Sequence, residues 1–258
     1  MVLVTQLPRL DRNRSLSSHD LDIARRRLAA AQRVTVLTGA GVSAESGVPT
    51  FRGAGGLWEN HRPEDLATPQ AFARDPALVW RWYQWRRGLI AQCRPNPAHV
   101  ALAGLERNKP RCTLITQNVD GLHRQAGSRD PLEIHGDIWR LRCLGCGRVW
   151  LSRDLGLPER PACPQCGGLA RPDVVWFGEA LDSAFLEKAW QAARLADYML
   201  VAGTSALVQP AAGLAAVAKE AGAFVVEVNL EPTPNSAWVD VSLFGKAGDI
   251  LPRLLEAL

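Results

Sequence analysis

The sequence contains no long hydrophobic segment. No uninterrupted apolar run reaches the roughly 18 residues that a membrane-spanning helix needs. The first residues, MVLVTQLPRLDRNRS, place basic side chains after a short apolar stretch and contain no small-residue cleavage site, so they do not resemble a secretory signal. We therefore expect a cytoplasmic protein without a membrane partner, whose residues 1–17 form a flexible N-terminus.

Lysine is scarce, and the positive charge is dispersed. Only four lysines occur among 258 residues, the arginines are scattered apart from short clusters such as Arg25–Arg27, and the formal net charge is +4. Because a dedicated nucleic-acid-binding protein usually carries a denser basic stripe, we expect no direct nucleic-acid partner. Hydrophobic residues at 47% and charged residues at 22% are ordinary for a globular protein, and the length suits one large domain with a small insertion.

Cysteine is also sparse, and its six positions divide into two groups. Cys93 and Cys112 are isolated in apolar surroundings, as small buried residues are. The other four form two Cys-x2-Cys pairs with sixteen residues between them: Cys143, Cys146, Cys163 and Cys166. In a chain without a secretion signal this spacing predicts zinc rather than disulfides, and four thiolates leave the metal no position for water. We expect one structural zinc ion.

Short β-branched segments alternate with helical ones. Four runs are typical of buried parallel strands: VTVLT at 34–38, CTLIT at 112–116, YMLVA at 198–202 and FVVEV at 224–228. Helices are predicted over 20–31, where Ser17 and Ser18 are candidate N-caps, over 210–220, where Pro210 would stand in the first turn, and over 249–258. The alternation predicts an α/β fold, a Rossmann-like parallel sheet covered on both faces.

Two segments interrupt this alternation. Residues 51–98 are helical and aromatic-rich, and residues 139–171 hold the paired cysteines with several Gly and Pro residues. We expect the helical segment and the zinc ribbon to pack together as a smaller module. The Rossmann-like domain would then comprise residues 18–50, 99–138 and 172–258.

A glycine-rich segment directly follows the first strand. In TGAGVS, residues 38–43, glycines would let backbone N–H groups approach a pyrophosphate, although ordinary turns produce the same pattern about as often. A hydride-transferring dehydrogenase would continue into a regular helix and a second strand ending in an acidic residue. Here Gly-Val-Pro at 47–49 is followed by a Phe-Arg-Gly loop at 51–53, which can fold over a bound ligand.

With this continuation, the chain resembles the sirtuin family from about residue 20 to the C-terminus. Six features occur in order: GAGVSAESGVPTFRG at 39–53, TQNVDGLH at 116–123, IHGD at 134–137, the paired cysteines, GTS at 203–205 and VNL at 228–230. The resemblance implies an NAD-dependent protein-lysine deacylase that consumes NAD as a co-substrate.

The resemblance also implies the reaction and its catalytic residues. In sirtuins the acyl-lysine carbonyl oxygen attacks C1′ of the nicotinamide ribose, nicotinamide leaves, and the resulting imidate is converted to free lysine and O-acyl-ADP-ribose. His135 matches the family's general base, and an imidazole pKa near ~6.5 suits proton transfer at neutral pH. Asn118 and Asp120 would contact the nicotinamide amide or a nearby water, and they could equally cap a helix. We interpret His123 as structural.

The NAD site implied by the resemblance gathers residues that follow several predicted strands. The predicted cofactor-binding residues are Gly39, Ala40, Gly41, Ser43, Glu45, Thr50, Phe51, Arg52, Trp58, Gln117, Asn118, Asp120, Gly203, Thr204, Ser205, Asn229, Leu230, Glu231 and Ala247. Arg52 would lie near the ribose and phosphates, and Gln117 near the ribose. Asn229 and Glu231 match the adenosine ribose end, and Ala247 matches a backbone contact to adenine.

Tyr83 and Arg86 bear on the acyl group. Three residues apart, they share a helix face, where a phenol and a guanidinium would bind a carboxylate. Class III sirtuins, including the mitochondrial desuccinylase and the bacterial CobB type, carry this Tyr-x-x-Arg motif with a small alanine, which Ala67 matches. The resemblance therefore implies removal of succinyl or malonyl groups alongside acetyl. The spacing alone is equally compatible with an amphipathic helix on which Arg87 shares the face with Tyr83.

Residues 173–179, DVVWFGE, match the segment along which sirtuins bind an extended substrate strand, largely through backbone hydrogen bonds. We expect acylated-lysine proteins as partners, with broad peptide tolerance. The predicted substrate-binding residues here are Val174, Val175, Phe177, Gly178 and Glu179.

Three other functions stay open on the sequence alone. They are an NAD-dependent dehydrogenase, a mono-ADP-ribosyltransferase and a non-enzymatic zinc-ribbon binding module. The last would leave His135 and the glycine-rich segment without a role. The sequence does not determine the oligomeric state, and a monomer is our working expectation.

Overall fold

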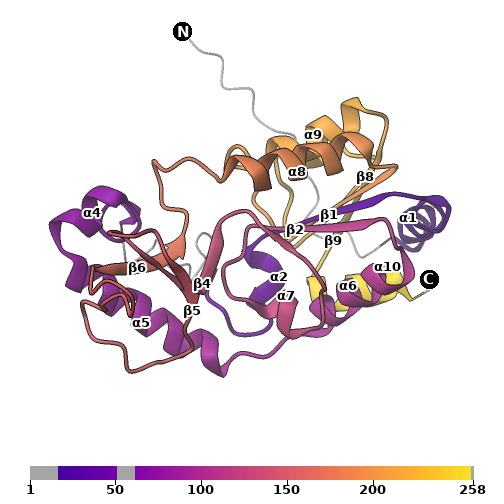
Figure 1. Ribbon diagram of the computed structural model, residues 1–258. Coiled ribbons are helices and arrows are strands. Elements are labelled where there is room, and N and C mark those ends of the chain that lie inside the picture. The colour runs from indigo at the N-terminus through magenta and orange to yellow at the C-terminus, as the bar shows by residue number, and fades with distance from the viewer. Residues whose placement is uncertain (1–16, 51–61, 257–258) are drawn as a thin grey trace, which may run out of the picture.

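The computed structural model describes residues 17–50 and 62–256, which are built around a six-stranded parallel sheet (Figure 1). The spatial order is β3-β2-β1-β7-β8-β9. The strands are β1 (Val34–Thr38), β2 (Cys112–Thr116), β3 (Leu132–Glu133), β7 (Tyr198–Ala202), β8 (Phe224–Asn229) and β9 (Val241–Phe244). All four predicted strands are confirmed, and β8 is one residue longer than expected. The strands β3 and β9 are too short to show a periodic pattern in the sequence.

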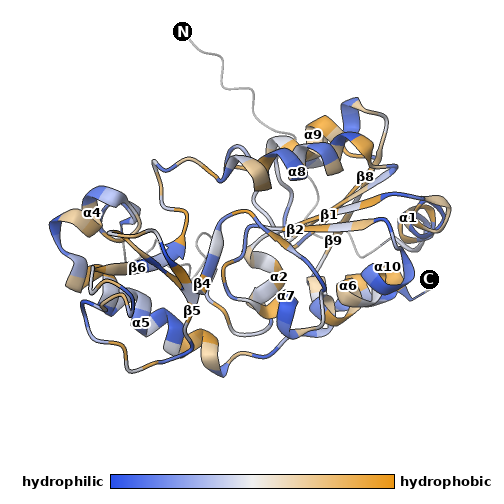
Figure 2. Ribbon diagram, viewed as in Figure 1, coloured by the Kyte–Doolittle hydropathy of each residue, from blue (hydrophilic) through white to orange (hydrophobic). Residues whose placement is uncertain are grey.

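The central strands are buried on both faces. Along β7, Tyr198, Leu200 and Ala202 belong to one hydrophobic cluster and Met199 and Val201 to another, because successive side chains of a strand point to opposite faces. The first face is covered by α1 (Ser18–Ala30), α6 (Pro97–Asn108) and α10 (Ala247–Leu255). The second is covered by α8 (Ser183–Leu195) and α9 (Gly213–Glu220), above the sheet in Figure 1. In Figure 2 the strands are mostly orange, and α8 and α9 carry both colours. The Rossmann-like fold is thereby confirmed.

Local signals set the helix ends. Ser17 is the N-cap of α1, and its Oγ accepts a hydrogen bond from the Asp20 N–H at 3.2 Å, as predicted. The prediction that Pro210 occupies a first helical turn is wrong. Residues 209–212 form a turn that contains the cis Gln209–Pro210 bond. The Gly213 N–H donates to the Pro210 carbonyl at 3.0 Å, and α9 begins only at Gly213. Within the described ranges, no helix is both long and apolar enough to span a bilayer.

A smaller module lies beside the sheet (Figure 1). Its helices α3 (Pro63–Leu66), α4 (Pro69–Arg74) and α5 (Pro76–Gln92) share one hydrophobic cluster with an antiparallel sheet of order β5-β4-β6. The strands are β4 (Gly136–Cys143), β5 (Val149–Leu151) and β6 (Ala170–Val174). The two predicted excursions therefore do pack together. The predicted domain boundaries stay predictions, and β4 and β6 run across two of them.

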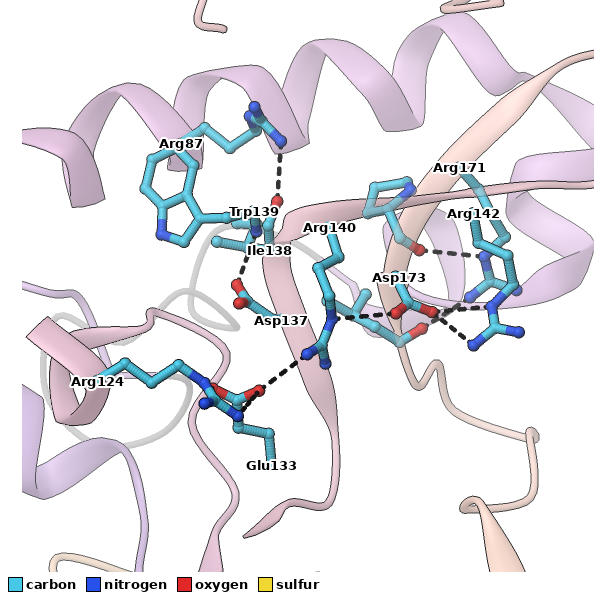
Figure 3. A network of polar contacts seen from close by, with 12 residues as sticks. Arg87, Arg124, Glu133, Asp137, Ile138, Trp139, Arg140, Arg142, Arg171 and Asp173 are labelled. Carbon is cyan, nitrogen blue, oxygen red and sulfur yellow. Dashed lines mark hydrogen bonds and ion pairs between the residues drawn. The ribbon is translucent and has the colours of Figure 1, made fainter. Parts of the chain in front are cut away.

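Arg87 fixes α5 to this small sheet from a fully buried position. Its guanidinium donates to the carbonyls of Ile138 (2.9 Å), Ser152 (2.7 Å) and Asp154 (3.0 Å), and it lies 5.0 Å from the centre of the Trp139 ring (Figure 3). Burial lowers its pKa to about 10, so the side chain stays charged at neutral pH. One cation thereby holds together three segments of the module.

Replacing Arg87 should destabilise the protein strongly. We expect Arg87→Met to lower the free energy of unfolding by about 3 kcal/mol, because three carbonyl oxygens lose a charged donor. Urea denaturation measures this. Arg81→Met on the same helix is the control. Among the described residues Arg81 forms only an exposed ion pair with Glu159, so this change should cost less than about 1 kcal/mol. Equal losses in the two variants would contradict this role for Arg87.

Candidate active site

The glycine-rich segment lies at the carboxyl edge of the large sheet. After β1 ends at Thr38, the short helix α2 (Ala40–Ala44) begins immediately beyond Gly39. The Gly39 N–H donates to the Ala202 carbonyl at 3.0 Å, and the Gly41 N–H donates to the Gly203 carbonyl at 2.8 Å. Gly203 has a φ of 61°, and a Cβ there would lie 2.3 Å from a backbone nitrogen of α2, so only glycine fits. Three of the predicted cofactor-binding glycines are thus brought together.

A buried polar cluster lies behind this segment. The Asn118 side-chain amide donates to the Gly39 carbonyl and to Ser43 Oγ, both at 3.1 Å. His99 Nδ1 accepts from the Asn96 N–H at 3.3 Å, so the proton is on Nε2, which donates to Ser43 Oγ at 3.3 Å. Burial lowers the pKa of His99 to about 4, and the ring is neutral at neutral pH. The orientation of Asn118 is therefore fixed by the protein itself.

Asp120 is also buried and takes part in the same cluster. Its Oδ1 accepts from the Leu122 N–H at 2.9 Å, which forms an Asx turn just before α7 (Leu122–Gln125), whose N-cap is Gly121. Burial raises its pKa, and hydrogen bonds from Leu122 and Ser43 partly oppose that rise. A carboxyl group with this environment is held in one position beside Ser43.

His135 lies between β3 and β4 and is half-buried. Its Nδ1 is 3.1 Å from the Gln117 carbonyl oxygen, which can only accept, so Nδ1 carries the proton and Nε2 carries the lone pair. Burial lowers its pKa, and the bond to Gln117 partly offsets this. The following residue must be glycine, because Gly136 has a φ of 84° and a Cβ there would lie 2.1 Å from the Asp173 carbonyl oxygen. At neutral pH this imidazole can accept a proton.

His123 has a different environment. It is buried on α7, its Nε2 is 2.9 Å from Thr38 Oγ1, and its ring centre is 4.9 Å from that of His99. Burial lowers its pKa to about 3. A neutral, enclosed histidine of this kind fits the structural interpretation.

Thr204 connects the residues predicted for the ribose and adenosine end. The Gln117 side-chain amide donates to Thr204 Oγ1 at 3.0 Å, and the Asn229 amide donates to the Thr204 carbonyl at 2.7 Å. Leu230 and Glu231, which follow β8, are exposed. The segments that follow β2 and β7 and the last residue of β8 are therefore in direct contact at one edge of the sheet.

The remaining predicted cofactor-binding residues lie around this edge. Glu45 Oε2 accepts from the Gly248 N–H at 2.6 Å and so connects the end of α2 to the start of α10, where Ala247 is buried. Ser205 is exposed, and Ala40 and Thr50 are half-buried. Three predicted residues lie outside the described ranges: Phe51, Arg52 and Trp58.

The residues predicted for the acyl group come together in the small module. Tyr83 and Arg86 are buried on α5, and Ala67 is the buried C-cap of α3. Burial raises the pKa of Tyr83, and the Arg86 charge opposes that rise. Because Arg87 donates to three backbone carbonyls, it is committed to the small sheet. Of the two arginines that the spacing left open, Arg86 is the one that acts on Tyr83.

Residues 174–179 contact both His135 and the residues predicted for the acyl group. The Val175 N–H donates to the His135 carbonyl at 2.9 Å, and Gly136 pairs with Val174 where β4 meets β6. The Phe177 N–H donates to the Ala67 carbonyl at 2.9 Å. One short segment therefore contacts both ends of the predicted substrate path.

Charged and aromatic side chains hold this segment in shape. Arg171 donates to both Glu179 carboxylate oxygens, and Glu179 Oε2 also accepts from the Trp176 N–H at 2.8 Å. The ion pair lowers the pKa of Glu179 against the effect of burial. Phe177 and Gly178 are exposed. The carboxylate of Glu179 thus shapes the turn from within the protein.

A chain of alternating charges joins the two sheets (Figure 3). Glu133 on β3 accepts from Arg124 at 2.7 Å and from Arg140 on β4 at 3.1 Å. Arg140 and Arg142 both donate to Asp173 on β6, at 3.3 Å and 2.8 Å. The carboxylates of Glu133 and Asp173 are largely buried, and each has two cationic partners. The network connects the strands on both sides of His135.

The four paired cysteines converge in the ribbon. Their sulfur atoms all lie within 4.8 Å of one another, and Cys143 and Cys163 are buried while Cys146 and Cys166 are exposed. The N–H groups of Gly145 and Gln165 donate to Cys143 and Cys163 sulfurs at 3.3 Å and 3.4 Å. Four thiols at this separation fit one tetrahedral zinc ion, and no residue of the His135 site is among the metal ligands. The predicted structural zinc site is confirmed.

Sequence reasoning missed several residues of this site. Trp176, His99, Arg171 and Glu133 all carry contacts described above, yet none was singled out. The partners of Glu133 and Arg171 are short distances away along the chain, but nothing in the sequence pairs them. Trp176 stood within a predicted binding segment, but its indole N–H donates to the Tyr83 hydroxyl at 2.9 Å, 93 positions away along the chain.

The chain is similar to known proteins over nearly its whole length. Residues 39–210 match the Sir2 family. The chain is 56% identical over 229 residues to NAD-dependent protein deacylase 2 of Pyrobaculum aerophilum, covering 89% of this chain and 92% of that protein. It is 51% identical over 226 residues to an NAD-dependent protein deacylase of Aquifex aeolicus, covering 87% and 95%.

Solved structures share the fold and much of the sequence. A Sir2 homologue in complex with NAD superposes with a TM-score of 0.88 at 46% identity, covering 95% of this chain and 96% of that one. A Sir2 protein bound to a myristoylated histone peptide superposes with a TM-score of 0.77 at 35% identity, covering 93% and 96%.

Removing one zinc ligand should empty the metal site and loosen the ribbon. For Cys163→Ser we expect the zinc content to fall from one ion per chain to roughly a tenth or less, because the tetrahedral site loses one of its four thiolates. Atomic absorption measures the metal, and limited proteolysis between residues 143 and 171 measures the ribbon's stability. Cys112→Ser, outside the ribbon, should retain the metal. Full zinc content in Cys163→Ser would contradict the assignment.

Proposed function

This chain belongs to the Sir2 family, and we propose that it removes acyl groups from protein lysines with NAD as co-substrate and His135 as general base. The activity is inferred from relatives that are NAD-dependent protein deacylases. The similarity to them covers 87–90% of this chain. The observation that carries the residue assignment is the bond between His135 Nδ1 and the Gln117 carbonyl.

That bond prepares His135 for proton abstraction. The Gln117 carbonyl keeps the proton on Nδ1 and leaves the Nε2 lone pair for a substrate hydroxyl. Burial lowers the imidazole pKa, so the reactive neutral form predominates at neutral pH. NAD, when bound, supplies the electrophilic ribose carbon and the hydroxyl that His135 deprotonates.

The NAD-binding role of the residues at the sheet edge is part of the proposal. Asn118, Gln117 and Thr204 present polar groups where β2 and β7 end, and their side chains are already oriented by hydrogen bonds. Open α/β sheets bind ligands at this edge. Preorganised groups of this kind bind a cofactor without an entropy cost for ordering the side chains. The exposed Ser205, Leu230 and Glu231 lie where the adenosine end would extend.

We also propose that the enzyme accepts succinyl and malonyl lysine alongside acetyl lysine. Tyr83 and Arg86 are buried together on α5, where a phenol and a guanidinium can hold a carboxylate. Ala67 belongs to the same hydrophobic cluster as Tyr83, and its small side chain would leave room for a longer acyl chain.

Acylated proteins are the proposed partners. The structure of a Sir2 protein bound to a myristoylated histone peptide supports a peptide substrate for this chain. Residues 175–179 follow β6 and turn at Phe177 and Gly178, and such a peptide would bind along the edge that Val174 and Val175 form, as expected for strand addition. The monomeric state, the cytoplasmic location and the absence of nucleic-acid binding stay predictions.

Replacing Arg86 should separate the acyl groups. For Arg86→Met we expect the KM for a succinyl peptide to rise about 10- to 100-fold and far more than the KM for an acetyl peptide, because a charge-assisted bond to the carboxylate is lost. Mass spectrometry of acetyl, malonyl and succinyl peptides, with and without NAD, provides the measurement. Arg81→Met on the same helix is the matched control. Equal effects of Arg86→Met on all acyl peptides would exclude the carboxylate clamp.

The pH dependence of the reaction should report His135. A general base works when deprotonated, and burial places its pKa below the ordinary value of 6.5. The rate should therefore fall on the acid side with a midpoint below pH 6.5, and this limb should disappear in His135→Ala together with roughly 100- to 10,000-fold of the rate. A pH profile of kcat/KM, which reports ionisations of the free enzyme, tests this. Substantial activity in His135→Ala would overturn the assignment.

A further inference from the structure

The indole of Trp176 is held from several sides. Its ring lies against the Arg171 guanidinium, 3.4 Å from the ring centre, and against the Phe72 ring at 5.1 Å between centres. Its backbone N–H donates to Glu179 at 2.8 Å, and the side chain is only 3% exposed. The direction of the indole N–H is therefore fixed by packing.

This N–H is bonded to the hydroxyl of the tyrosine in the acyl site. Trp176 Nε1 lies 2.9 Å from the Tyr83 hydroxyl oxygen. Because an indole N–H can only donate, the hydroxyl oxygen is the acceptor, and the phenol's own proton must point in another direction. A tyrosine without this bond could rotate its proton toward any nearby acceptor.

Among the described residues the phenol proton has no acceptor, although Tyr83 is only 2% exposed. A buried O–H without an acceptor costs free energy, and a ligand oxygen would recover it. The Arg86 charge acts on the same phenol and favours a negatively charged group beside it. A carboxylate provides both the acceptor and the charge.

We propose that Trp176 is a positioning residue for acyl selectivity: its indole N–H occupies the Tyr83 oxygen and directs the phenol proton to the carboxylate of a succinyl or malonyl group. This inference rests on the proposed acyl range of the enzyme and deepens it. Trp176 contributes no contact of its own to the acyl group, and it acts through Tyr83. An acetyl group has no carboxylate, so it gains nothing from the directed proton.

The test compares Trp176→Phe, Tyr83→Phe and the double variant by the ratio of kcat/KM for succinyl and acetyl peptides. We expect Trp176→Phe to lower this ratio about three- to tenfold, mainly through KM for the succinyl peptide, as for the loss of one hydrogen bond. Tyr83→Phe should lower it at least as much. In the double variant the Trp176 change should have no further effect, because its acceptor is already gone.

Trp80→Phe is the matched control for loss of packing. Trp80 is also buried in the small module, and its indole N–H also donates one bond of 2.9 Å, but to the Ala170 carbonyl. Its replacement should lower the melting temperature, as that of Trp176 does, and leave the acyl ratio unchanged. A similar change of ratio in both variants would overturn the proposal.

The outcomes also separate this inference from the function on which it rests. If wild-type enzyme shows no Arg86-dependent removal of succinyl groups, the acyl range itself is wrong. If wild type removes them and Arg86→Met loses the preference, but Trp176→Phe or Tyr83→Phe retains it, only the role of Trp176 fails. Should Trp176→Phe not fold, an unchanged ratio in Tyr83→Phe still overturns the proposal.

Discussion

The structure depends on the register of three parallel strands. Thr38, the last residue of β1, is aligned with Thr116 of β2 on one side and with Ala202 of β7 on the other. Because all three strands end at one level, the segments that follow them meet at one edge of the sheet. There the backbones of Gly39, Gly41 and Gly203 approach so closely that side chains are excluded. A slip of one strand would separate the groups that we propose bind NAD.

The second requirement is that the large sheet and the small sheet meet at His135. His135 is covalently joined to β3 of the large sheet and to β4 of the small one, and its carbonyl accepts from Val175. The charges of Glu133, Arg140 and Asp173 tie the same strands together (Figure 3). Buried ion pairs contribute less to stability than to a defined arrangement, and here the arrangement orients the proposed base toward the substrate segment. The four cysteines suited to a structural zinc ion lie at the far end of the same small sheet.

The sequence predicts the repetitive and the chemically distinctive parts of this molecule. Strands β1, β2 and β7 have the predicted bounds because apolar residues lie on both faces of each strand. The spacing of the four cysteines is sufficient to predict a zinc site. What could not be predicted depends on contacts between distant positions. Arg87 is distinguished from Arg86 only by its bonds to the carbonyls of Ile138, Ser152 and Asp154, which lie more than 50 positions away along the chain. The Trp176–Tyr83 bond and the turn at Pro210 likewise follow from packing, for which the local residues carry no signal.

We propose that this chain consumes one NAD for each acyl group that it removes. The most direct measurement is the stoichiometry of the reaction, with free nicotinamide, deacylated peptide and O-acyl-ADP-ribose quantified together by mass spectrometry. Equal amounts of all three are expected, with no nicotinamide release in the absence of an acylated peptide. Reduction of NAD with the nicotinamide ring retained, or ADP-ribose left attached to a protein acceptor, would contradict this proposal.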